Sequence, residues 1–107
     1  MEQISVRQLH EMQARGEPIY LLDVRQPWEH ELVHLPGDQL VPLEELTERA
    51  DEIDPPEGAL IVAYCHHGIR SINAAVLLER LGHRRVASLA GGIERWAADI
   101  APSLPRY

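Results

Sequence analysis

The chain has 107 residues, of which 45% are hydrophobic, and a formal net charge of −7 at pH 7. This length is sufficient for one domain with a hydrophobic core, which we expect to span residues 1–107. The negative charge argues against a nucleic-acid partner, because a protein that binds nucleic acid usually has a basic stripe. No apolar run approaches the roughly 20 residues that cross a bilayer, so we expect no membrane insertion.

Short apolar runs bounded by turn residues predict buried strands, and apolar residues at helical spacing predict helices between them. In chain order, we predict a helix with Ser5 as N-cap that ends at Gly16, a strand over Ile19–Val24, one or two helical turns over Pro27–Val33, a short strand at Leu40–Val41, an amphipathic helix over Leu43–Ile53, a strand over Leu60–Tyr64, a helix over Ser71–Leu81, a strand over Val86–Leu89, a helix over Ile93–Ile100 and an extended tail over Pro102–Tyr107.

This alternation of strands and helices predicts an α/β fold, with a small and mostly parallel sheet and helices on both faces. Ligands of such sheets bind at the carboxyl ends of the strands. Cys65, the only cysteine, directly follows the predicted strand Leu60–Tyr64. A single cysteine cannot form an internal disulfide, and the amino terminus has no pattern of a secretory signal, so we expect a cytoplasmic protein.

The segment from Cys65 to Arg70, here called the Cys65 loop, is the strongest candidate site. It contains His66, His67, Gly68 and Ile69, and it leads into the helix predicted from Ser71. A loop that opens a helix can direct several backbone N–H groups inward, and the helix N-terminus adds about half a positive charge. Such a loop stabilises a thiolate and binds an anion beside it. We therefore predict that Cys65 is a nucleophile for a small anionic substrate.

Three charged residues have candidate roles near this cysteine. Arg70 either binds the anionic substrate or pairs with an acidic residue to brace the loop, since a planar guanidinium suits both roles. Asp23 and Arg25 lie at the end of the strand Ile19–Val24, and we expect them to form a local ion pair near Cys65. We expect the side chains of His66 and His67 to face solvent rather than to act in acid–base catalysis.

The residues His30-Glu31-Leu32-Val33-His34 match the H-E-x-x-H zinc signature of metalloproteases. That site needs a continuous helix, a third ligand and a large cleft, whereas Pro36 and Gly37 end any helix here. We therefore expect no metal centre and no cofactor. We expect Trp28 and Trp96 to be packing residues, with Trp28 a weaker candidate for the wall of the substrate pocket.

Taken together, the motifs resemble the rhodanese homology domain, a sulfurtransferase module. The segments that carry the resemblance cover nearly the whole chain: Leu22-Asp23-Val24-Arg25, Glu29-His30, His34-Leu35-Pro36-Gly37, Tyr64 to Ser71, Ala74-Ala75, Leu89 to Ile93, and Trp96. The family usually has glycine at the position of Val33 and a small residue at that of Asp38, so this chain departs from the pattern at that turn.

The resemblance implies a single-domain thiosulfate sulfurtransferase that uses no cofactor. Cys65 would take the outer sulfur of thiosulfate as a persulfide and pass it to cyanide, or to a thiol or protein acceptor. The N–H groups from His66 to Arg70 would stabilise the negative persulfide. Asp23, Arg25 and Ser71 would support the loop.

Two alternatives remain at this stage. The first is a phosphatase- or arsenate reductase-like enzyme that uses the same Cys–Arg loop. The loops of those enzymes have one more residue between the cysteine and the arginine. A non-enzymatic module for sulfur relay or protein interaction would turn over thiosulfate only incidentally.

Overall fold

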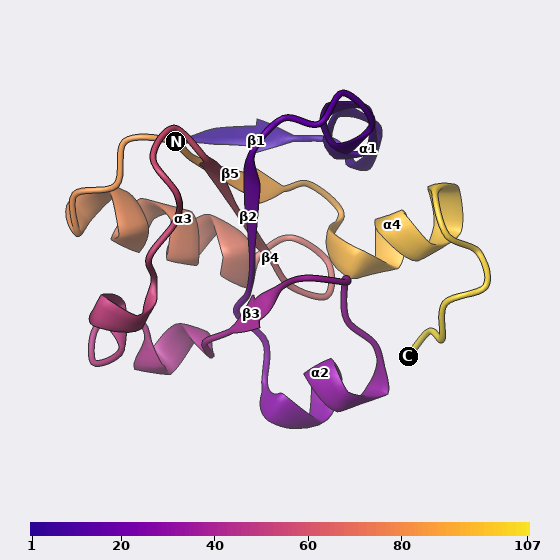
Figure 1. Ribbon diagram of the computed structural model, residues 1–107. Coiled ribbons are helices and arrows are strands. Elements are labelled where there is room, and N and C mark those ends of the chain that lie inside the picture. The colour runs from indigo at the N-terminus through magenta and orange to yellow at the C-terminus, as the bar shows by residue number, and fades with distance from the viewer.

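The computed structural model describes all residues from Met1 to Tyr107 and contains one sheet of five parallel strands in the order β1-β5-β4-β2-β3 (Figure 1). The strands are β1 (Glu2–Ile4), β2 (Ile19–Asp23), β3 (Gln39–Leu40), β4 (Leu60–Tyr64) and β5 (Val86–Leu89). The helices are α1 (Val6–Ala14), α2 (Pro27–Leu32), α3 (Arg70–Arg80) and α4 (Gly92–Asp99). The α/β class and the parallel sheet predicted from the sequence are thus confirmed.

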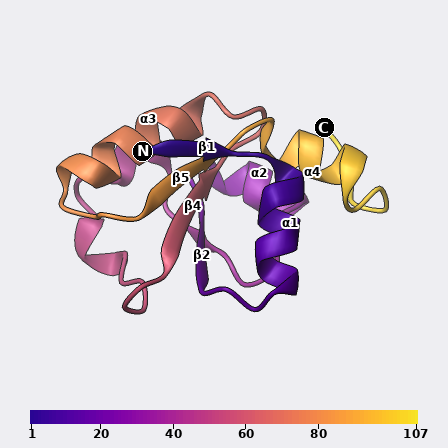
Figure 2. The ribbon, with the colours of Figure 1, turned by 90° about the horizontal axis from the view of Figure 1, so that it is seen from above.

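Two apolar clusters cover the two faces of the sheet. Figure 2 shows α1 and α3 on opposite sides of the strands. Leu9 of α1 and Trp96 of α4 pack in one cluster, and Leu78 of α3 packs in the other. Successive residues of β2 alternate between them, with Leu21 in the first cluster and Leu22 in the second. This alternation follows from the two-residue period of a strand, and it explains why the central strands are apolar throughout.

The first helix begins where the sequence predicts. The Ser5 side chain accepts a hydrogen bond from the backbone of Gln8, and the Gln8 side chain accepts one from the backbone of Ser5, which forms a capping box. The strand β1 before it was not predicted. Only its last residue, Ile4, is buried, so no apolar run indicates an edge strand there.

The predicted amphipathic helix over Leu43–Ile53 is wrong. Two short 3₁₀ turns, Leu43–Glu45 and Ala50–Glu52, replace it. Contacts outside the segment fix both ends, because the Leu43 N–H donates to Val24 O at 3.0 Å and the Gln39 side chain donates to Glu52 O at 3.0 Å. Between these anchors, two separate turns bury Leu46 and Ile53 without a continuous helix.

The tail after α4 is not simply extended. A turn in which Leu104 N–H donates to Ala101 O folds it back, and Tyr107 lies against the Cys65 loop. None of the helices has the length and apolar character needed to cross a membrane.

Candidate active site

Cys65 lies immediately after β4 and is 1% exposed. Its sulfur accepts hydrogen bonds from the backbone N–H groups of Gly68 at 3.2 Å and Ser71 at 3.4 Å. The Ser71 hydroxyl lies 3.6 Å from the same sulfur and 2.7 Å from the hydroxyl of Ser88 on β5. Two backbone N–H groups of the loop region are therefore aimed at the sulfur.

The start of α4 sets the orientation of the Cys65 loop. Cys65 O accepts from Ile93 N–H at 2.9 Å, and His66 O accepts from Glu94 N–H at 3.1 Å. In a trans peptide, the carbonyl and the following N–H point in opposite directions. The N–H groups of His66 and His67 therefore face away from α4.

Two glycines allow this close approach. A Cβ at Gly92 would lie 2.4 Å from the carbonyl oxygens of Cys65 and His66. A Cβ at Gly68 would lie 3.0 Å from Gly91 N, and Gly68 has φ +101°, a conformation that side chains disfavour. Glycine at these two positions is thus a geometric requirement of the site.

Four N–H groups of the loop donate to no acceptor in the protein: those of His66, His67, Ile69 and Arg70. The loop residues line a pocket of about 220 Å³, with Cys65 among the lining residues. The free donors beside a buried sulfur can bind an anion that carries its charge close to that sulfur.

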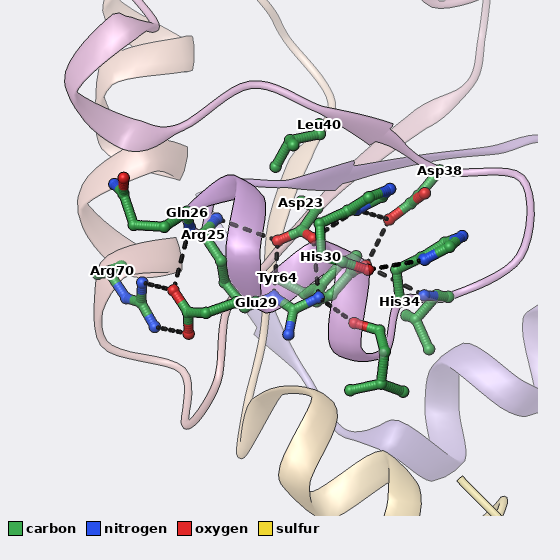
Figure 3. A network of polar contacts seen from close by, with 12 residues as sticks. Asp23, Arg25, Gln26, Glu29, His30, His34, Asp38, Leu40, Tyr64 and Arg70 are labelled. Carbon is green, nitrogen blue, oxygen red and sulfur yellow. Dashed lines mark hydrogen bonds and ion pairs between the residues drawn. The ribbon is translucent and has the colours of Figure 1, made fainter. Parts of the chain in front are cut away.

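Arg70 makes the bracing contact rather than presenting a free guanidinium. It donates two hydrogen bonds to the Glu29 carboxylate of α2, at 2.7 and 2.9 Å (Figure 3). Glu29 is buried and also accepts a hydrogen bond from the Tyr107 hydroxyl at 2.7 Å. The contact ties the last residue of the Cys65 loop to α2, which is one of the two roles expected from the sequence.

These contacts control the charge of Glu29. Burial by itself would raise its pKa, but hydrogen bonds from Arg70, Tyr107 and the Gln26 backbone outweigh that effect and lower it to about 2. A carboxyl whose pKa is lower in the folded protein than in the unfolded chain stabilises the fold at pH values above 4.5, the ordinary pKa of this group. The contribution is lost as the pH falls toward 2.

We therefore expect the free energy of unfolding of the wild type to fall more steeply between pH 4.5 and 2 than that of Glu29→Gln. Urea unfolding at several pH values across this range measures the difference. Glu57→Gln, at an exposed site, is the matched control and should parallel the wild type. Equal slopes for the wild type and Glu29→Gln would contradict the assignment.

Asp23 and Arg25 form the expected ion pair, and it is completely buried. Both side chains have 0% exposure, and Arg25 donates to the two carboxylate oxygens of Asp23 at 2.8 Å each. Arg25 also donates to Val33 O at 2.6 Å and to the Tyr107 hydroxyl at 2.8 Å. Asp23 is in register with Tyr64, so the pair lies beside the end of β4 (Figure 3).

Tyr107 closes one side of the loop. Its ring stacks on His66 with the centroids 3.9 Å apart and the planes 8° apart. Burial and the neighbouring His67 lower the pKa of His66, so its ring is neutral and suited to this stacking at neutral pH. The expectation that both histidine side chains face solvent is therefore wrong for His66.

The two tryptophans differ. Trp96 packs in the core as predicted, whereas Trp28 is 58% exposed and meets the Tyr107 ring in a T-shaped arrangement, so the core packing predicted for Trp28 is wrong.

Three contacting residues were missed as site residues: Glu29, Ser88 and Tyr107. Glu29 follows Pro27 and Trp28 and completes a capping box with Gln26, a local signal that explains its position but not its contact with Arg70. No local pattern indicates the contacts of Ser88 or Tyr107, which lie far from their partners in sequence.

The fold and the site define a small α/β domain that presents one buried cysteine in an amide-lined loop. The family model of the rhodanese-like domain matches residues 5–99, and the chain belongs to this family. The resemblance seen in the motifs is thus confirmed.

Individual relatives also contain domains similar to this chain. The probable adenylyltransferase/sulfurtransferase MoeZ of Mycobacterium tuberculosis is 32% identical over 104 residues, which cover 97% of this chain and 26% of that protein. The adenylyltransferase and sulfurtransferase uba4 of Ogataea parapolymorpha is 33% identical over 106 residues, which cover 99% of this chain and 26% of that protein. The chain thus spans about a quarter of the length of these relatives and is homologous to sulfurtransferase domains.

Solved structures support the same fold. The human single-domain sulfurtransferase TSTD1 superposes with a TM-score of 0.80 at 25% identity, and the match covers 92% of this chain and 97% of that chain.

Proposed function

We propose that the protein is a sulfurtransferase that carries sulfur as a persulfide on Cys65, with thiosulfate as a donor. The Cys65 thiolate attacks the outer sulfur of thiosulfate, the S–S bond of thiosulfate breaks, and sulfite leaves with the bonding electrons. A nucleophilic acceptor, either cyanide or a thiol, then attacks the terminal sulfur of the persulfide and releases the Cys65 thiolate. The two half-reactions balance without a cofactor.

The ring of backbone donors around the Cys65 sulfur carries this proposal. Gly68 and Ser71 already donate to the sulfur, and the N–H groups of His66, His67, Ile69 and Arg70 have no acceptor in the protein. A persulfide places one additional anionic atom beyond the Cys65 sulfur, which these donors would stabilise as an oxyanion hole does. We further propose a reducing compartment such as the cytoplasm, because the reaction requires a free thiol.

The sharpest test is the mass of the intact protein after incubation with thiosulfate. The proposal expects a gain of one sulfur atom, which cyanide removes and which Cys65→Ser does not show. Absence of the adduct in the folded wild type would contradict the persulfide route. A mass gain that persists in Cys65→Ser would place the sulfur elsewhere.

A protein acceptor is the form of the reaction that the exposed side chains favour. Ile69, in the lining of the Cys65 pocket, is 74% exposed. We infer that an acceptor protein covers this apolar side chain when it reaches the pocket, because burial of apolar surface favours association. One relative, the putative sulfur carrier protein YrkF of Bacillus subtilis, is 32% identical over 94 residues and supports a relay role. Ile69→Ser should slow transfer to a protein acceptor and leave transfer to cyanide nearly unchanged, whereas equal effects on both acceptors would argue against docking at Ile69.

The length of the Cys65 loop predicts its selectivity against phosphate. Only four residues separate Cys65 from Arg70. Both terminal guanidinium nitrogens of Arg70 already donate hydrogen bonds to the Glu29 carboxylate. A tetrahedral phosphate or arsenate needs donors for three oxygens at roughly 2.7–3.1 Å, and therefore a wider ring. We expect no significant hydrolysis of p-nitrophenyl phosphate and no arsenate reduction. Catalytic efficiency on the aryl phosphate above that on thiosulfate would overturn the assignment.

A further inference from the structure

A second cluster of chemically capable side chains lies outside the Cys65 pocket. His30 of α2, His34 and Asp38 bring their potential ligand atoms within 4.8 Å of one another. Figure 3 shows the three side chains together on one side of the Asp23–Arg25 pair. The His30 and His34 rings are stacked, with centroids 4.0 Å apart and planes 14° apart. Nothing in the proposed sulfur transfer uses this cluster.

The tautomer of the neutral His30 ring follows from its neighbour. His30 Nδ1 lies 2.9 Å from Asp23 Oδ2, and both Asp23 carboxylate oxygens accept hydrogen bonds from the buried Arg25. A carboxylate only accepts hydrogen bonds, so His30 Nδ1 carries the proton and donates it. In the neutral ring, the lone pair is therefore on Nε2. A histidine that donates one nitrogen to a carboxylate and binds an ion through the other is a recurrent arrangement in metal sites.

His34 has the same tautomer for a parallel reason. Its Nδ1 lies 3.0 Å from the backbone oxygen of His30, which can only accept a hydrogen bond. Nδ1 of His34 is thus protonated as well, and its Nε2 is free. Both rings are oriented by acceptors on their Nδ1 side, so both present an unprotonated Nε2.

Asp38 supplies an oxygen ligand. Its side chain is 3% exposed and accepts a hydrogen bond from the Tyr64 hydroxyl, which in turn accepts from Leu35 N–H at 3.1 Å. Gly37, with φ +79°, makes the turn that places the carboxylate here. Asp38 occupies the position where related domains usually have a small residue, so this ligand is a property of this chain.

We propose that His30, His34 and Asp38 bind a divalent transition-metal ion of the zinc type. Imidazole nitrogen and carboxylate oxygen are ligands of such ions, and three protein ligands leave a position open for water. Ligands at about 2.0–2.1 Å from a tetrahedral ion lie about 3.3 Å apart. Because the two near-parallel rings cannot both direct Nε2 at one ion, the cluster must contract on binding, and the exposed His34 must leave the ring stack and its hydrogen bond to His30 O to do so.

The arrangement differs from the metalloprotease centre that the H-E-x-x-H match suggests. As expected from Pro36 and Gly37, α2 ends at Leu32, so the two histidines do not share one continuous helix. The structure instead supplies the third ligand, Asp38, from the turn that follows. Cys65 is not part of the cluster, so the ion is not required for the proposed sulfur transfer.

The test is Zn²⁺ binding by the 107-residue chain in competition with a chromogenic chelator. Cys65→Ser serves as the background, because the thiol would otherwise bind zinc itself. We expect one equivalent of Zn²⁺, with affinity at least tenfold weaker in His34→Ala and Asp38→Asn. His10→Ala, which removes an exposed histidine of α1, should bind as tightly as the background protein.

Co²⁺ provides an independent readout, because visible absorption bands of the bound ion report nitrogen and oxygen ligands. These bands should appear in the background protein and in His10→Ala, and they should be lost in His34→Ala. Asp38→Asn retains an oxygen that can accept from Tyr64, so circular dichroism should show an intact fold. Stoichiometric binding that His34→Ala and Asp38→Asn leave unchanged, or no binding by the folded background protein, would overturn the proposal.

Discussion

Replacing Cys65 with serine is expected to lower sulfur transfer from thiosulfate to cyanide by a factor on the order of a thousand or more, because a hydroxyl is a much poorer nucleophile and forms no persulfide. The fold should remain intact. Serine is slightly smaller than cysteine and can accept the same hydrogen bonds from the Gly68 and Ser71 N–H groups. Steady-state kinetics and circular dichroism of the purified variant measure the two effects.

A matched variant separates loss of the nucleophile from disturbance of its surroundings. Ser88→Ala removes the hydroxyl that contacts Ser71 but leaves the Cys65 sulfur in place. It should retain most of the transfer activity. Substantial activity in a folded Cys65→Ser protein would exclude covalent catalysis by this residue, because the chain has no other cysteine.

The largest effect on stability is expected at Arg25. Arg25→Met leaves the Asp23 carboxylate buried with its principal counter-charge removed, which typically costs roughly 3–5 kcal/mol. The variant also loses the hydrogen bonds that Arg25 donates to Val33 O and the Tyr107 hydroxyl. Urea unfolding monitored by tryptophan fluorescence would measure the change, with Arg15→Met, at an exposed arginine, as the control.

A double variant distinguishes the buried charge from the lost packing. Asp23→Asn/Arg25→Met removes both formal charges and should lose less stability than Arg25→Met alone, because no buried carboxylate then lacks a partner. If the double variant is the less stable of the two, the uncompensated charge is not the main cause of the destabilisation.

The central fold could be predicted because its signals are local. Each of the strands β2, β4 and β5 is a short apolar run between turn residues, and α1 carries a cap within its own sequence. Where tertiary contacts decide the structure, prediction failed. The segment Leu43–Ile53 has the composition of a helix, but hydrogen bonds to Val24 and from Gln39 divide it into two turns.

The candidate site also has one part that local sequence predicts and another that depends on tertiary contacts. Cys65 and its amide donors lie within seven consecutive residues, so chain order alone brings them together. Glu29 is 41 residues from Arg70, and Tyr107 is 78 residues from Glu29. These contacts depend on the packing of α2 and the tail against the end of β4. The sequence could indicate that Arg70 requires either a substrate or an acidic partner, but only the fold identifies Glu29.

The strand order has a consequence for synthesis of the protein on the ribosome. β1, made first, pairs only with β5, and the Cys65 and His66 carbonyls find their partners only in α4. A nascent chain that has emerged as far as Cys65 therefore has an unpaired first strand and an unbraced thiol loop. Because sheets built from such distant pairings form slowly, the cysteine reaches its final surroundings only after α4 has been made. Until then it is open to oxidation and to non-native contacts from which the finished fold shields it.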